Sequence, residues 1–322
     1  MGVLWTIAAM HHTLGRPRVD DAPAIHELIA AYDTAVIGAP DVTLDDVADE
    51  LAEPGFDLGQ DGWLARDAGG RLTAWAWAHR IGDGDLVNVQ VIVRPGAEEA
   101  DELAAELWRL VIARARELGA ERGHDHVTVD LDVHRSDEAK QTQAKELGFE
   151  PGTSFHRMRI DHSGSVDAPV PPDGVTLHTG ESEQVRREAH GVQQAGFAEH
   201  FGFVPVDYDS WYARRQAQSV NDWSQLTLAR ADGRPAGVVI GNNQFLPDED
   251  CGYVAVLAVL PEFRGRGIGR FLLRHAFASD AARGRRGTIL HVDSNNTTPA
   301  LGLYESAGMH PVLVIDVWRR RL

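Results

Sequence analysis

The sequence predicts an α/β protein with two mixed sheets, one in each of two similar units that follow one another along the chain. Three observations support this prediction. Apolar runs of strand length alternate with helices that carry one apolar stripe. A segment rich in Pro, Gly and Ser divides the 322 residues near their middle. The order of predicted strands and helices is similar on both sides of this segment, as in a diverged tandem repeat.

The dividing segment, DHSGSVDAPVPPD, covers residues 161–173 and has no apolar periodicity, so it is predicted to be a linker. The first domain then spans residues 14–160 and the second residues 174–322, and each is long enough to bury a core. Residues 1–13 contain a short apolar run that has neither a basic start nor a small-residue cleavage site. We interpret them as a disordered or over-annotated start.

Composition limits the partners and the location. Lys and Arg number 31 against 48 Asp and Glu, and the net charge of −17 disfavours nucleic acid, which needs a basic surface. No apolar run reaches the roughly 18 residues of a membrane helix. The single cysteine, Cys251, excludes an internal disulfide and favours a reducing compartment. We therefore expect a cytoplasmic protein, monomeric or homodimeric, that binds neither nucleic acid nor membrane.

In the second half, each element follows from a local pattern. The turn Asp232-Gly233 joins two apolar stretches into a hairpin. Pro261 ends an apolar strand, and apolar residues at helical spacing mark three helices. The predicted strands are residues 175–178, 224–231, 235–242, 253–259, 288–292 and 312–318. The predicted helices are residues 181–198, 267–283 and 300–307.

The first half repeats this order. A hairpin turn at residues 67–71 joins two strands, and a later apolar strand ends at Pro95 as its counterpart ends at Pro261. The predicted strands are residues 63–66, 72–79, 86–93 and 127–133. The predicted helices are residues 22–32, 98–118 and 138–147. The last of these helices ends before Gly148, which matches Gly308 in the second half.

The most informative segment is residues 253–270, YVAVLAVLPEFRGRGIGR. Here an apolar strand enters a Gly-rich turn, and an amphipathic helix leaves it. The first turn of a helix offers unpaired N–H groups and a partial positive charge, and glycines let an anion approach them. Arg264, Arg266 and Arg270 add positive charge. The segment therefore predicts a phosphate cradle.

Two other phosphate-binding motifs fit this segment poorly. A P-loop requires Gly-Lys-Ser or Gly-Lys-Thr, whereas Gly269 is followed by Arg270. A dinucleotide-binding fingerprint requires a third glycine, and Arg270 stands at that position. A third motif, Arg/Gln-x-x-Gly-x-Gly/Ala, is satisfied by Arg264, Gly267 and Gly269.

A second motif follows the predicted helix and strand. Residues 292–309 read VDSNNTTPALGLYESAGM, with Asn296, Ala300, Tyr304 and Gly308 in turn. Together the two motifs resemble the GNAT family of acyl-CoA N-acyltransferases over most of residues 174–322. The form of the second motif is similar to that of actinobacterial tandem GNAT proteins, of which mycothiol synthase is the best known.

The resemblance implies acetyl-CoA as co-substrate and gives roles to individual residues. The backbone of Leu257, Ala258 and Val259 is expected to pair with the pantetheine arm. The implied pyrophosphate site consists of Arg264, Gly265, Arg266, Gly267, Ile268, Gly269 and Arg270. Asn296 is expected to reach the pantetheine or adenine end of CoA. Tyr304 is expected to protonate the departing thiolate, since a thiol leaves more readily beside a proton donor.

An acceptor amine must lose a proton before it attacks. Glu249 and Asp250, just upstream of the strand, are the candidate bases. Mycothiol synthase carries a glutamate farther along this strand, where the alignment puts Tyr253, and this difference argues against mycothiol synthesis. Glu199 and His200 follow the first helix of this domain, where GNAT acceptor sites often lie, although the aromatic residues around them are also typical of a core.

We therefore predict an N-acetyltransferase that moves an acetyl group from acetyl-CoA to a primary amine of a small molecule by direct attack. Mycothiol synthase or an antibiotic-modifying acetyltransferase is the alternative among enzymes. A non-catalytic acyl-CoA-binding sensor is the alternative from another class. No metal is expected, since His124, His126 and His134 lack the spacing of a zinc site.

The first domain is predicted to be a degenerate GNAT unit without activity. Its apolar strand is followed by RPGAEEAD, with one glycine where the second domain has three. Glu98, Glu99 and Asp101 occupy the start of the helix, where they suit the helix dipole and would repel a pyrophosphate. Ala144 stands where the second domain has Tyr304.

Overall fold

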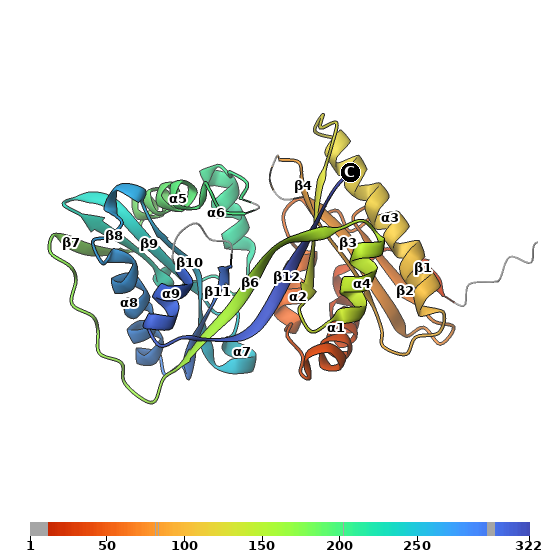
Figure 1. The fold of residues 1–322 in the computed structure, drawn as a ribbon, viewed down its shortest axis with the longest axis horizontal. Helices are drawn as coiled ribbons and strands as arrows, with labels where there is room; N and C mark the ends of the chain where they lie inside the picture. The colour runs from red at the N-terminus through yellow and green to blue at the C-terminus, as the bar shows by residue number, and fades with distance from the viewer. Residues whose placement is uncertain (1–11, 81, 83, 202, 295–299) are drawn as a thin grey trace, which may run out of the picture. The chain divides into compact units, whose positions relative to one another are not determined.

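The computed structural model describes residues 12–80, 82, 84–201, 203–294 and 300–322 (Figure 1). Contacts group the chain into two compact units. The first runs to Leu131 and includes Arg320–Leu322, and the second spans Asp132–Arg319. Among the described residues, no helix combines the length and the apolar character needed to cross a membrane.

The first unit has the strand order β1-β2-β3-β4-β5. Its strands are β1 (Thr13–Gly15), β2 (Gly62–Arg66), β3 (Leu72–Arg80), β4 (Leu86–Val93) and β5 (Thr128–His134). Its helices are α1 (Ala22–Ile37), α2 (Leu44–Leu51) and α3 (Ala100–Ala120). Neighbouring strands are antiparallel except β4 and β5, which pair in parallel. Apolar side chains of α1 and α2 form one core cluster with Trp75 of β3.

The start of the first unit lies closer to the chain terminus than the sequence suggested. Thr13 begins β1, and the neighbouring His12 ring is buried, with its Nε2 atom 2.8 Å from the carbonyl oxygen of Glu98. Of the segment 1–13, residues 12 and 13 are therefore part of the fold. Residues 1–11 lie outside the described residues.

The second unit has the strand order β12-β6-β11-β10-β9-β8-β7. Its strands are β6 (Glu150–Asp161), β7 (Val175–Thr179), β8 (Leu226–Ala231), β9 (Arg234–Asn242), β10 (Cys251–Val259), β11 (Gly287–Asp293) and β12 (His310–Arg321). Its helices are α4 (Glu138–Glu146), α5 (Glu183–Phe197), α6 (Tyr208–Ala217), α7 (Leu246–Glu249), α8 (Ile268–Ala282) and α9 (Ala300–Ser306). Among the described strand pairs of this unit, β10 and β11 alone run parallel.

Helices cover both faces of this second sheet (Figure 1). α5 and α6 pack on one face, and α8 packs on the other with α9 beside it. The faces alternate along β9, where Val238 and Ile240 belong to the cluster under α5 and Val239 to the cluster under α8. The sheet is therefore buried on both sides, as its long apolar strands require.

β6 is the main difference from the organisation predicted from sequence. The prediction assigned residues up to 160 to the first domain, ahead of the linker. In the structure β6 lies between β11 and β12 within the second unit, antiparallel to both. Contacts consequently divide the chain after Leu131 and not in the segment 161–173. The other strands and helices expected from sequence are present, β4 with the predicted bounds and the rest with shifted ends, and β1, β6, α2, α6 and α7 were not expected.

Candidate active site

A cavity of about 480 Å³ lies in the second unit where β10 and β11 separate. The two strands pair in parallel from Cys251–Gly287 to Val254–Leu290. Beyond that point β10 continues beside β9, with a bulge before Val256, and β11 continues beside β6. Backbone N–H and C=O groups on the inner edges of the two strands therefore face the cavity instead of each other.

The loop between β10 and α8 forms one end of this cavity. Gly265 and Gly267 have φ angles of 76° and 77°, in the left-handed region that favours glycine. Gly267 caps the N-terminus of α8, and a Cβ atom added to either glycine would meet nothing within 4 Å. The N–H groups of the first turn of α8 thus border open space, an arrangement that binds phosphate anions.

Three arginines surround the glycine loop. The Nε atom of Arg264 donates to the carbonyl oxygen of Val259 (3.3 Å), and Nη2 of Arg270 donates to Oγ of Ser306 (2.7 Å). Both arginines line the cavity. Arg266 does not line it and instead forms an ion pair with Asp232 (3.1 Å). Arg264 of the loop and Arg270 of α8 therefore add positive charge to the lining of the cavity.

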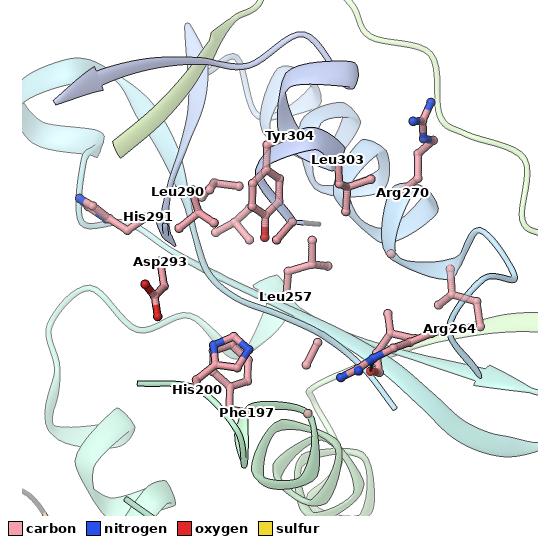
Figure 2. A pocket seen from close by; sticks show the side chains of 18 of the residues that line it. Phe197, His200, Leu257, Arg264, Arg270, Leu290, His291, Asp293, Leu303 and Tyr304 are labelled. Atoms are coloured by element: carbon pink, nitrogen blue, oxygen red, sulfur yellow. Dashed lines mark hydrogen bonds between the residues drawn. The ribbon is translucent and has the colours of Figure 1, made fainter. Parts of the chain in front are cut away.

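Tyr304 enters the cavity from α9, and only 8% of its surface is exposed. Figure 2 shows its hydroxyl group pointing into the cavity. Burial raises the pKa of this phenol to about 12, so the hydroxyl keeps its proton at neutral pH. A protonated phenol in this position can donate to a group that becomes negatively charged during a reaction.

Asp293 and His200 also line the cavity. Asp293, the last residue of β11, is buried and accepts a hydrogen bond from Oγ1 of Thr153. His200 follows α5, and burial lowers the pKa of its ring; Asp293 and Glu199 raise that pKa and Arg264 lowers it. With its pKa lowered overall, the His200 ring is mainly neutral at pH 7. Sequence reasoning named His200 but missed Asp293, whose only local signal is a carboxylate directly after an apolar strand.

A hydrogen-bonded chain of side chains crosses from β6 to β10. Nε of Arg157 donates to Nε2 of His291 (3.1 Å), and Nδ1 of His291 lies 3.0 Å from the hydroxyl of Tyr253. Because Arg157 occupies Nε2, the neutral ring carries its proton on Nδ1 and donates it to Tyr253. Both ring nitrogens of His291 are therefore engaged. Burial raises the pKa of Tyr253 to about 12.

Residues 193–309 match the family described as acetyltransferase (GNAT). Residues 193–309 of this chain therefore form a GNAT domain. Its relatives include the mycothiol acetyltransferase of Thermobispora bispora, 30% identical over 60% of this chain and 65% of that protein, just under two thirds. The mycothiol acetyltransferase of Nocardioides sp. is 27% identical over 81% of this chain and 90% of that protein.

Two solved structures share the fold of this chain over nearly its whole length. The GCN5-related N-acetyltransferase of Sphaerobacter thermophilus superposes with a TM-score of 0.81 at 25% identity, covering 97% of this chain and 96% of that one. A tandem GNAT protein from the clavulanic acid biosynthesis pathway gives 0.72 at 18% identity, covering 96% and 98%. The predicted family, the predicted fold class of tandem mixed-sheet GNAT units and the prediction of an acyltransferase are confirmed.

Most residues that the GNAT resemblance singled out meet in one cavity. Those that line it are Leu257, Ala258, Val259, Arg264, Gly265, Gly267, Ile268, Gly269, Arg270 and Tyr304. They come from β10, the loop after it, α8 and α9. Asn296 lies outside the described residues.

Glu249 and Asp250, the candidate bases from sequence, lie at the other end of β10. Glu249 ends α7 and forms an ion pair with Arg159. Asp250 has a left-handed φ of 52°, and its carbonyl oxygen accepts a hydrogen bond from the N–H of Arg286 (2.7 Å). Neither residue lines the cavity. A strand rises about 3.3 Å per residue, so β10 carries both carboxylates away from the point where it leaves β11.

Proposed function

We propose that this GNAT protein transfers an acetyl group from acetyl-CoA to a primary amine of a small molecule by direct attack. One observation carries the proposal: a single cavity joins the free edge of β10, the glycine loop and the hydroxyl of Tyr304. CoA carries a pyrophosphate, an extended arm with two amide groups and a terminal thiol, in that order. An anion site, a strand edge and a proton donor in the same order match these three parts.

The residues are proposed to divide the binding of CoA along the cavity. The N–H groups of residues 264–270 bind the pyrophosphate, and Arg264 and Arg270 add charge. The backbone of residues 257–259 pairs with the amides of the pantetheine arm, as a peptide pairs with a sheet edge. Arg266 joins the site only if it leaves Asp232. Asn296 contacts the pantetheine or adenine end.

Tyr304 is proposed to act at the sulfur end. The amine nitrogen bonds to the acetyl carbon, the C–S bond breaks, and the leaving sulfur takes the phenolic proton. A phenol with a pKa of about 12 gives its proton to a thiolate unfavourably. The step is completed because the phenolate then recovers a proton from the newly acylated nitrogen, which is cationic at that moment and strongly acidic. Tyr304 thus ends each cycle protonated.

The domain roles and the location are proposed together. Residues 174–322 are proposed to form the catalytic domain together with β6, which comes before the linker 161–173, and the part of residues 14–160 that belongs to the first unit is proposed to be a degenerate GNAT domain. In the first unit Glu99 caps α3, and Asp101 and Glu102 follow in its first turn, a charge pattern that disfavours an anion. The protein is proposed to work in the cytoplasm, as a monomer or homodimer, where one cysteine suits a reducing environment.

A second candidate is mycothiol acetyltransferase activity. The observation that favours it is the similarity to the Nocardioides sp. relative of that name over 90% of its length. This candidate belongs to the same reaction class and differs only in the acceptor. Glu249 and Asp250 stay candidate bases for an acceptor that binds outside the cavity.

Incubation of the whole protein with acetyl-CoA and a panel of primary amines tests the proposal. The panel contains amino acids, amino sugars, aminoglycosides, arylalkylamines and a cysteinyl amino sugar. We expect at least one amine to gain the mass of one acetyl group, with one CoA thiol released for each product molecule. A protein that binds CoA in calorimetry yet acetylates none of these amines would favour an acyl-CoA sensor and contradict the proposal.

A further inference from the structure

We propose that His200 is the catalytic base that accepts the proton of the acceptor amine, and that Asp293 is the residue that positions it. This inference rests on the proposed acetyl transfer and adds the proton acceptor and the direction from which the amine arrives. His200, Asp293 and Tyr304 line the same cavity. Tyr304 and His200 reach that cavity from opposite sides (Figure 2).

The alternation of strand residues explains the opposite sides. Tyr304 packs in the cluster under α8 with Leu290 and Val292 of β11. Asp293 is the next residue along β11 and therefore faces the opposite side of the sheet. That opposite face is covered by α5, which packs against Ala258 of β10.

The end of α5 lies unusually close to β10. A Cβ atom added to Gly196 would be 2.9 Å from the Cβ atom of Ala258, closer than real Cβ contacts. Glycine at this position lets the helix end directly over the separated strand, and His200 follows three residues after the last helical residue, Phe197. The turn thus places an imidazole beside the gap on the face opposite to the phenol.

The charged groups around His200 suit a proton acceptor. Asp293 and Glu199 favour the protonated ring, while burial and Arg264 oppose it. The neutral ring is then ready at pH 7, and the imidazolium that forms has a buried carboxylate, Asp293, in the same cavity. Among the described residues, no hydrogen bond holds either ring nitrogen of His200, so one nitrogen can take a proton.

The other polar side chains near the cavity are poor proton acceptors. Both ring nitrogens of His291 are engaged by Arg157 and Tyr253. The phenol of Tyr253, with a pKa of about 12, stays protonated. Glu249 lies at the far end of β10 in an ion pair with Arg159. Compared with these three groups, His200 has a ring that is mainly neutral at pH 7 and lines the cavity, while the Asp293 carboxylate already accepts a hydrogen bond from Thr153.

His200 and Tyr304 together account for every proton transferred in the proposed reaction. The amine arrives as an ammonium ion and gives one proton to His200, which makes its nitrogen nucleophilic. The nitrogen attacks the thioester carbon, the C–S bond breaks, and the sulfur leaves with the proton of Tyr304. The acylated nitrogen returns one proton to Tyr304. The imidazolium releases its proton to water, so each turnover yields one amide, one CoA thiol and one proton.

The test uses full-length His200→Ala and Asp293→Asn proteins, with His310→Ala as a matched control at an exposed histidine of β12. The acceptors are the panel alkylamine that the wild type acetylates fastest, and hydroxylamine, which is small and largely unprotonated at neutral pH. We expect His200→Ala to lower kcat/KM for the alkylamine by about 10²–10⁴. CoA binding in calorimetry and transfer to hydroxylamine should stay close to wild type. Free imidazole should restore alkylamine turnover.

The pH profile tests Asp293. In the wild type, kcat/KM for the alkylamine should fall toward acid as His200 gains a proton, with an apparent pKa below the usual histidine value. Asp293→Asn should shift this acid-side fall in kcat/KM to still lower pH, because the carboxylate raises the pKa of His200 in the wild type.

The outcomes separate a failure of the proposed acetyl transfer from a failure of the role proposed for His200. A wild type that acetylates no amine overturns the proposed function and this inference with it. An active wild type overturns the inference alone if His200→Ala keeps its activity, or if its loss extends to hydroxylamine and resists imidazole. Circular dichroism and CoA calorimetry identify a misfolded variant, and an NMR titration of the His200 ring in the wild type then gives the decision. A ring that stays protonated above pH 7 would contradict its role as the base.

Discussion

Gly267 provides the sharpest test of the phosphate cradle, because its backbone conformation and its charge environment can be perturbed separately. Its φ of 77° is left-handed, and an added Cβ atom meets nothing within 4 Å, so a side chain projects into open space at the end of the cavity. A non-glycine residue in this conformation costs about 1–2 kcal/mol. That strain is present with and without CoA, so it lowers stability and leaves affinity largely unchanged.

A charged side chain at position 267 is expected to change the affinity for CoA. A carboxylate about 5 Å from a pyrophosphate charge, at an effective dielectric constant of about 20, is repelled by about 3 kcal/mol. This corresponds to about a hundredfold in the dissociation constant. We therefore expect Gly267→Glu to bind CoA about a hundredfold more weakly than Gly267→Gln, which has the same size and no charge.

Isothermal titration calorimetry at low and at high salt measures this ratio, which should shrink as salt rises. Gly284→Glu is the matched control, since Gly284 follows α8 at its other end with φ of 79° and the same open space. It should bind CoA like the wild type. Equal affinities for the Glu and Gln variants at position 267 would refute the assignment of the pyrophosphate to this loop.

Three further predictions concern the acid, the first unit and the core. Tyr304→Phe should lower kcat by about 10²–10⁴ with CoA affinity unchanged, and an unchanged kcat would leave Tyr304 only a packing role. Calorimetry should find one CoA per chain, since acidic residues at the start of α3 disfavour a pyrophosphate; two sites would contradict the degenerate first unit. Gly252→Ala should lower the free energy of unfolding by about 1–3 kcal/mol, because its Cβ would lie 2.1 Å from the carboxylate of Asp280, which is bonded to Arg285 and Thr288. Gly191→Ala, in open space inside α5, is the control and should not lower the melting temperature, because alanine suits a helix better than glycine; a Gly252→Ala protein that melts no lower than the wild type would contradict this packing.

The sequence was most informative where the chemistry is local. The strand, glycine turn and helix of residues 253–270 follow one another without interruption, so their pattern alone predicts β10, the cradle and α8. Tyr304 was predicted with them because its motif has a fixed spacing. All these residues reach the cavity through elements whose ends the sequence marks with proline or glycine.

The sequence was least informative where contacts are distant. β6 has Pro151 and Gly152 next to its first residue, and charged residues alternate with apolar ones over residues 157–161, so it lacks the continuous apolar run of a buried strand. Its partners β11 and β12 come much later in the chain. Asp293 was missed for the same reason, since its hydrogen-bond donor Thr153 lies 140 residues earlier. Glu249 and Asp250 were predicted as bases because they directly precede the strand in the sequence. The extended β10 places them at the end of the strand opposite to the cavity.

Hydrogen exchange with and without CoA tests most directly the claim that the gap between β10 and β11 is the cofactor site. The whole protein is labelled, digested and analysed by mass spectrometry. We predict that CoA slows exchange in peptides covering residues 257–259 and 264–270, and leaves residues 94–101 of the first unit unchanged. Protection of residues 94–101, or of neither segment despite saturating CoA, would contradict the account.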